Sequence, residues 1–282
     1  MSTPRPYLVT ALAPSASLRE AVNTHWRVYL MEFTELAALM LSTCSFGTLL
    51  YSNDSPLGSI GLSLSLRMLL MGTAIAITTF LIIRSPFGRR SGAHFNPAIT
   101  LTYCWLQRVH RWDAFCYVVA QFAGGVMGVL VAREGLGMRL SVAPVRYIVT
   151  VPGDHGSLVA LAGEYCLAGI LMGIVLYSSN HRVLVRFTPL LVALLTICYY
   201  TFSSSISGFS VNPARSFSSA LFAWIWQGIW IYFLAPCLGM LTAAALYIRL
   251  MGRNRVYCAK VFHDLRSPCP FRCQFERVYQ ET

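Results

Sequence analysis

Two short phrases in the sequence each combine an asparagine, a proline and an alanine. Residues 94–101 read HFNPAITL and residues 210–217 read SVNPARSF, with the asparagines 116 positions apart. Each asparagine suits the N-cap of a helix, and the proline after it suits the first helical position. An amide NH2 donates hydrogen bonds, and a helix N-terminus carries roughly half a positive charge. The two triplets are therefore expected to present donors and positive potential; they comprise Asn96, Pro97, Ala98, Asn212, Pro213 and Ala214.

Three charged residues accompany these phrases. Arg215 lies three positions after Asn212 and offers a permanently charged fork of five donors, which repels cations and binds a water oxygen or a solute hydroxyl. Glu32 and Glu164 lie near the starts of two apolar segments, where an unpartnered charge is costly. We expect both carboxylates to accept hydrogen bonds from the irregular backbone that precedes each triplet.

The composition indicates a lipid environment. The chain of 282 residues is 56% hydrophobic and 12% charged, whereas soluble domains have about 25% charged residues. The net charge of +11 does not indicate a nucleic-acid partner, because the basic residues sit in short loops and tails, where they act as topology signals. The expected partners are membrane lipid and small solutes.

Six apolar runs are long enough to cross a bilayer, which takes about 20 residues. They are residues 28–50, 62–83, 114–132, 158–179, 187–206 and 228–250. Two shorter stretches, 96–105 and 212–222, follow the two asparagines, and a helix of that length covers about 15 Å, half of the hydrocarbon core. We expect each to enter the membrane only to its middle.

The order of these segments predicts an inverted repeat in an all-α membrane protein. Residues 28–132 and 158–250 each contain span, span, half-helix and span. Three spans per half is an odd number, so the second half must insert upside down. With both tails in the cytoplasm, 17 of the 22 lysine and arginine residues lie on that side. The positive-inside rule therefore predicts cytoplasmic termini in a cell membrane.

The phrases SGAHFNPAITL and GFSVNPARSF, together with Glu32, Glu164 and Gln121, resemble the aquaporin family over about residues 26–250. The resemblance implies six spans, two half-helices that meet at mid-membrane, a pore in every subunit and a homotetramer. It implies an N-terminal tail (1–26), a channel domain (27–250) and a basic C-terminal tail (251–282). Glu32, Glu164 and Gln121 are then loop-supporting residues.

The resemblance also implies a selectivity filter of Met71, Tyr200, Phe209 and Arg215. Strict water channels usually have Phe, His and Cys or Thr with the arginine, and glycerol facilitators usually have Trp, Gly and Phe. Phe209 is glycerol-like, Tyr200 adds a bulky ring with a hydroxyl, and RSPFG (84–88), between Met71 and Asn96, looks like an insertion relative to the family. Other positions are typical of water channels: Ser216, Ala220, Tyr232 and Phe233.

We therefore expect a passive water channel that excludes protons and ions and leaks small neutral solutes. The alternative is a facilitator for glycerol or another small neutral solute (a polyol, hydrogen peroxide, ammonia, urea or a metalloid hydroxide). A secondary transporter is the remote alternative, because coupling needs a titratable group at mid-depth and the pair there is two neutral amides. An enzyme is not expected, since the sequence has no H-E-x-x-H and GFSVN departs from G-x-S-x-G.

The remaining signals concern one histidine and the C-terminal tail. His94 is expected to face the inner vestibule of the pore. The basic tail is expected to lie against anionic lipid headgroups, with a regulatory partner as the alternative. The Cys269 and Cys273 pair lacks companion ligands at the usual zinc spacing, so neither a metal site nor a cofactor is predicted.

Overall fold

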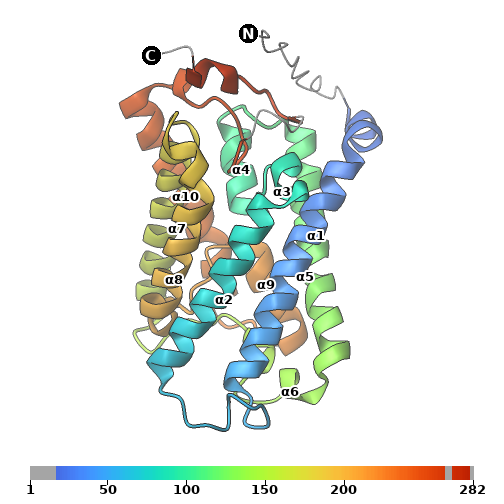
Figure 1. Ribbon diagram of the computed structural model, residues 1–282, viewed down its shortest axis with the longest axis vertical. Helices are drawn as coiled ribbons and strands as arrows, with labels where there is room; N and C mark the ends of the chain where they lie inside the picture. Colours follow the sequence, from blue (N-terminus) through green and yellow to red (C-terminus); the bar gives the residue numbers. More distant parts are fainter. Residues whose placement is uncertain (1–16, 264–268, 280–282) are drawn as a thin grey trace, which may run out of the picture.

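Six long helices form a bundle in the computed structural model, which describes residues 17–263 and 269–279 (Figure 1). All six are long and apolar enough to cross a membrane. Their bounds match the six predicted spans: α1 Leu18–Tyr51, α2 Leu64–Arg84, α5 Arg111–Leu136, α7 Ser157–Ser179, α8 Thr188–Ser207 and α10 Ile229–Met251. The expected all-α membrane architecture is confirmed.

Two short helices, α4 (Pro97–Trp105) and α9 (Pro213–Ala223), lie inside the bundle and occupy opposite halves of its length (Figure 1). Each begins where the sequence predicts. The Asn96 side-chain oxygen accepts from the Ala98 N–H at 2.9 Å, and the Asn212 oxygen accepts from the Ala214 N–H at 3.1 Å. The asparagines are thus the N-caps, with each proline at the first helical position.

The backbone before each half-helix has the same unusual shape in both halves. Gly92 and Gly208 have φ of 106° and 76°, and Phe95 and Val211 have φ of 29° and 48°. A positive φ is strained for residues with a side chain, and such strain persists only where surrounding contacts impose it. Positions 116 apart share this conformation, which supports the inverted repeat. Across the halves α2 packs against α8, while α1 packs against α5 and α7 against α10.

The segments that connect or precede the spans contain helical structure that the sequence analysis did not predict. Residues 84–88 lie where α2 ends and α3 (Pro86–Ser91) begins, and the Ser85 hydroxyl caps α3. Residues 18–26, assigned to the tail by the sequence, are helical, because Ser17 caps α1 through a hydrogen bond from the Glu20 N–H. Between α5 and α7 the chain forms only a short helix, α6 (Met138–Ser141), and one 3-10 turn.

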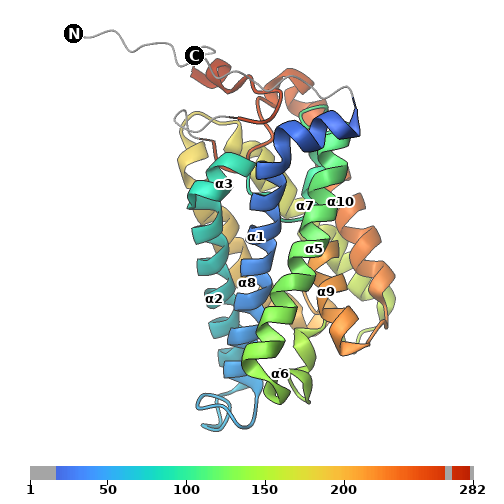
Figure 2. The same ribbon diagram turned by 90° about the vertical axis from the view of Figure 1, so that its right-hand side faces the viewer.

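The C-terminal segment folds back over one end of the bundle, which we call the tail face; the other end is the opposite face (Figures 1 and 2). Residues 256–261 are all buried there, each at most 3% exposed. The sequence predicts this segment on a lipid surface, whereas in the structure its side chains pack into the protein. Two 3-10 turns, Arg253–Arg255 and Phe275–Tyr279, flank the buried part.

Candidate functional site

The two asparagines join the tips of the half-helices through a reciprocal pair of hydrogen bonds. The Asn96 Nδ2 donates to the Val211 carbonyl at 2.8 Å, and the Asn212 Nδ2 donates to the Phe95 carbonyl at 2.8 Å. An amide NH2 carries two protons, so each asparagine keeps one donor beyond this bond. The two helix N-termini therefore point their positive ends at a shared centre.

An internal cavity of about 90 Å³ contains this centre. It is large enough for several water molecules in line. Both asparagines line it, as does Arg215. Most of the remaining wall is apolar and includes Ile75, Ile83, Ile99, Val175, Val192 and Leu195. A file of molecules in the cavity thus meets few hydrogen-bonding groups apart from those of the half-helix tips.

Glu164 holds the loop before α9. Its buried carboxylate accepts hydrogen bonds from the Ser207 hydroxyl at 2.8 Å, the Ser210 N–H at 2.9 Å and the Val211 N–H at 2.6 Å. These bonds satisfy backbone groups that would otherwise be unpaired in the membrane interior. They also orient the Val211 carbonyl, which is the acceptor for Asn96.

Glu32 has the matching role in the first half. Its carboxylate accepts from the His94 N–H at 3.0 Å, the Phe95 N–H at 2.7 Å and the Gln121 amide at 2.8 Å. The structure therefore brings Glu32, Gln121 and the first loop together, as the resemblance implies. Glu35, to which the sequence assigns no role, accepts a hydrogen bond from the Ser91 hydroxyl at 2.7 Å.

Two tyrosines also support the loops, a role that the sequence analysis assigned to neither of them. The Tyr117 hydroxyl of α5 donates to the Ser91 carbonyl at 2.7 Å, and the Tyr232 hydroxyl of α10 donates to the Ser207 carbonyl at 2.6 Å. They lie in the third span of each half, so aligning the two halves would have drawn attention to them.

Arg215, Tyr200 and Phe209 line the same cavity on the side of the asparagines away from the tail face. The Tyr200 hydroxyl interacts with the Arg215 guanidinium, and the Tyr200 and Phe209 rings meet edge to face at 5.5 Å. The Arg215 side chain is buried, yet its Nη1 has no hydrogen-bond partner within residues 17–263 and 269–279. That donor is thus unpaired among the described residues, while the Arg215 residue as a whole borders the cavity. In the first half the equivalent position is Ile99, so only one half carries the charge.

Met71 differs from the other proposed filter residues. It is fully buried and is not among the described residues that line the cavity. Its methyl group lies 3.7 Å from where a Cβ on Gly47 would be, so it packs towards α1. Ile75, one helical turn further along α2, lines the cavity instead. Met71 lies one turn before Ile75, Thr79 and Ile83 on the same face of α2, so its place in the filter stays a prediction.

His94 does not reach the cavity wall either. The ring is fully buried, with its Nδ1 3.0 Å from the Thr100 hydroxyl and its Nε2 2.7 Å from the Ala259 carbonyl. It stacks on Tyr103 at 5.3 Å and on Phe271 at 5.4 Å. The expected vestibule residue is thus covered by the C-terminal tail.

Six spans around two apposed half-helices, with a cavity running past their tips, define a membrane channel. The sequence matches the Major intrinsic protein family over residues 17–247, and the chain belongs to this family. It is thus an integral membrane protein of a family of channels rather than enzymes.

Two curated relatives are plant proteins. A putative aquaporin NIP4-1 from Arabidopsis thaliana is 31% identical over 65% of this chain and 64% of its own length. A probable NIP-type aquaporin from Nicotiana alata is 32% identical over 64% of this chain and 66% of its own length. The chain thus spans slightly under two thirds of the length of both relatives.

A solved structure shares the fold. The X-ray structure of the aquaglyceroporin from Plasmodium falciparum superposes with a TM-score of 0.66, covering 82% of this chain and 99% of that one, at 21% identity.

Proposed function

We propose that this chain is a passive channel that conducts water and excludes protons and ions. The observation that carries the proposal is the meeting of Asn96 and Asn212 in one cavity, each with an amide proton beyond the cross-loop bond. A water molecule between them turns its oxygen towards both donors. It then cannot accept a hydrogen bond from the next water, so a proton-conducting chain is interrupted.

Ion exclusion has a second source in the charges along the cavity. The positive ends of α4 and α9 repel cations, hydronium included. Arg215, which lines the cavity, adds a permanent positive charge and a guanidinium with five donors. An anion that enters the cavity loses its hydration shell, and the mostly apolar walls do not replace those interactions, so its entry is unfavourable.

A second candidate function is the passage of small neutral solutes such as glycerol, urea or hydrogen peroxide. It is supported by the apolar walls, which lower the cost of passing a less hydrated solute, and by Phe209. The fold is also that of an aquaglyceroporin. The bulky ring of Tyr200 lies beside Phe209 and Arg215, and it argues against the passage of large polyols.

We further propose that the tail face is cytoplasmic in a cell membrane and that four copies assemble with one pore each. The support for orientation is the charge distribution along the sequence, which assigns 17 of 22 basic residues to the tails and to the loops on the same side as the tails. The support for assembly is family membership together with the many exposed apolar side chains on the six spans.

Stopped-flow light scattering on reconstituted vesicles tests the proposal. Water entry much faster than in protein-free vesicles, with slow glycerol and urea entry and no dissipation of a pH gradient, is the expected result. Equal swelling with and without protein contradicts channel function. Fast glycerol entry identifies the second candidate instead.

A further inference from the structure

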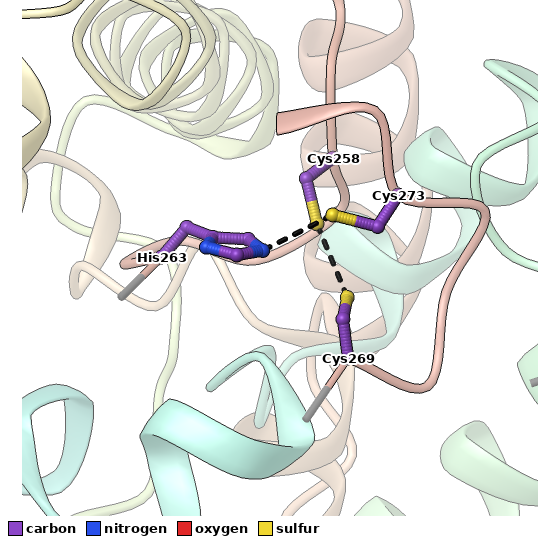
Figure 3. A group of neighbouring side chains, drawn as sticks. All are labelled: Cys258, His263, Cys269 and Cys273. Atoms are coloured by element: carbon purple, nitrogen blue, oxygen red, sulfur yellow. Dashed lines mark hydrogen bonds between the residues drawn. The ribbon is translucent and has the colours of Figure 1, made fainter. Parts of the chain in front are cut away.

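Four side chains in the C-terminal tail converge on one point outside the pore. Their candidate ligand atoms, the sulfurs of Cys258, Cys269 and Cys273 and a ring nitrogen of His263, all lie within 4.8 Å of one another (Figure 3). The His263 Nε2 is 3.1 Å from the Cys273 sulfur, and the Cys258 sulfur is 3.4 Å from the Cys269 sulfur. Three of the four residues are buried, and Cys273 is partly buried.

This set matches the chemistry of one metal. Zinc takes three thiolates and one imidazole in a closed tetrahedral site, with bonds of about 2.3 Å to sulfur and about 2.0 Å to nitrogen. Tetrahedral angles then place neighbouring sulfurs about 3.8 Å apart. Only small side-chain adjustments separate the observed spacing from this geometry. We propose that Cys258, His263, Cys269 and Cys273 bind a structural zinc ion that holds the tail in the mouth of the pore.

The sequence analysis did not predict this site, because Cys258 and His263, 11 and 6 positions before Cys269, do not stand at the usual zinc spacing. The spacing is C-x4-H-x5-C-x3-C, which departs from the usual pair-and-pair zinc pattern. Folding of the tail over the bundle brings Cys258 and His263 to the other two. With the tail face in the cytoplasm, thiols remain reduced, and a cysteine cluster there favours a metal over disulfides.

The surroundings suit a site with a net negative charge. Three thiolates and a neutral imidazole around Zn²⁺ leave a charge of −1. Arg108 interacts electrostatically with Cys258 and Cys273, and Lys260 does so with Cys269. The His263 ring is stacked on Phe275 at 4.1 Å with an interplanar angle of 12°, which fixes its orientation.

The segment between the first two proposed zinc ligands, Cys258 and His263, packs on the loop that precedes α4. Between Cys258 and His263, the Ala259 carbonyl is hydrogen-bonded to the His94 ring at 2.7 Å, and the Val261 N–H donates to the Gly92 carbonyl at 3.0 Å. The Lys260 ammonium donates to the Arg89 carbonyl. Val261 also lines the cavity that contains both asparagines.

The second segment touches the same histidine. Phe271, between Cys269 and Cys273, stacks on the His94 ring with an interplanar angle of 2°. His94 is therefore held from two sides by loops whose ends are zinc ligands. Zinc thus locks Val261 at the tail-face end of the cavity, and its removal is expected to release the tail and open that end. This second step rests on the proposed channel function, whereas the zinc site does not.

Metal analysis of the purified full-length protein tests the site. Protein kept in a thiol-free reductant is expected to carry one zinc per chain by mass spectrometry of the metal. Substitution with Co²⁺ is expected to give the intense visible bands of a tetrahedral thiolate site. Cys269→Ser is expected to lose the metal and these bands, whereas Cys166→Ser, at an exposed position in α7, is expected to retain both.

A second variant separates loss of a ligand from loss of the fold. His263→Cys supplies four thiolates, so it is expected to bind Co²⁺ with a shifted spectrum. Wild-type protein without stoichiometric zinc, or a Cys269→Ser variant that keeps the wild-type spectrum, would overturn the site. So would a Cys258–Cys269 disulfide, found by mass spectrometry under non-reducing conditions in protein that fails to bind added zinc.

Water flux tests the coupling to the pore. Chelation of zinc is expected to raise the water permeability of wild-type vesicles several-fold, with no change in full-length Cys269→Ser, which lacks the metal. If wild-type protein conducts water and binds zinc but chelation leaves flux unchanged, the coupling is overturned and the site stands. If no variant conducts water, the proposed function fails, and the binding experiment still decides the site.

Discussion

The Val261 N–H donates a hydrogen bond to the Gly92 carbonyl at 3.0 Å. Gly92 opens the strained loop that ends in Asn96, and Val261 belongs to a tail that the sequence places outside the channel domain. The bond therefore ties the C-terminal tail to the backbone that positions the first half-helix. A movement of the tail at Val261 therefore acts on Gly92, which is four residues before Asn96 at the pore centre.

The tail-face end of the cavity is the place to test this contact. Val261→Ala removes two methyl groups from the cavity wall and is expected to raise water permeability, because the side chain narrows the file of molecules. Val256→Ala is the matched control, since Val256 is fully buried in the same tail and is not among the described residues that line the cavity. Stopped-flow light scattering gives both values. Equal permeability in the two variants would place Val261 outside the conducting path.

Asn212→Asp replaces the amide donor by a carboxylate. The new anion faces the Phe95 carbonyl, its former acceptor, and presents no proton to the cavity. Water flux is expected to fall about tenfold, which corresponds to about 1.4 kcal/mol on the barrier. Asn23→Asp, an exposed position in α1, makes the same chemical change and is expected to leave flux unaltered. Wild-type flux and wild-type proton exclusion in the Asn212 variant would refute its role.

Arg215→Val removes the buried charge of the filter. Cations and larger neutral solutes are expected to enter, because the guanidinium no longer repels charge or fills the lumen beside Tyr200. Arg215→Lys keeps the charge without the planar fork, so it is expected to retain cation exclusion. Ion conductance in planar bilayers and solute swelling assays measure the two effects. An unaltered profile in the valine variant argues against a filter at this position.

Tyr200→Ala opens the constriction that its ring forms with Phe209. Glycerol entry is expected to rise several-fold, since the apolar walls on either side already tolerate a less hydrated solute. Phe202→Ala is the control, because Phe202 lies on the same helix and is 72% exposed on its outer side. Glycerol uptake equal to wild type in the Tyr200 variant would remove this residue from the filter.

Glu164→Gln disturbs the loop before α9 without changing side-chain size. One carboxylate oxygen becomes an NH2, so a donor among Ser207, Ser210 and Val211 loses its acceptor. The loss of one buried hydrogen bond is expected to cost about 1–3 kcal/mol of stability. Thermal unfolding in detergent is expected to show a lower midpoint, with reduced water flux. Glu134→Gln, at an exposed position, serves as control, and equal midpoints would contradict a supporting role.

The spans and half-helices could be predicted from local sequence. Their positions depend on runs of apolar residues and on capping signals such as Asn96-Pro97 and Asn212-Pro213, which act within a few residues. Their inverted arrangement followed from counting spans. The structure confirms each of these elements, with bounds that shift by a few residues except at α1, which begins ten residues earlier because Ser17 caps it.

The walls of the cavity could be predicted only in part. Tyr200, Phe209 and Arg215 come together there, and α2 contributes Ile75, which lies one turn from Met71. Which turns of α2 border the cavity depends on how that helix packs against α8, and a single sequence does not show this packing.

Local sequence was sufficient for the bilayer-spanning framework and the two amide-capped half-helices, because hydrophobic length and capping are properties of consecutive residues. The contacts that cover His94 could be found only from the folded chain. The hydrogen bond from His94 to Ala259 joins residues 165 positions apart, and it forms because the tail packs back into the bundle end. Such contacts depend on the complementary shapes of distant surfaces, which no local pattern of residue types records.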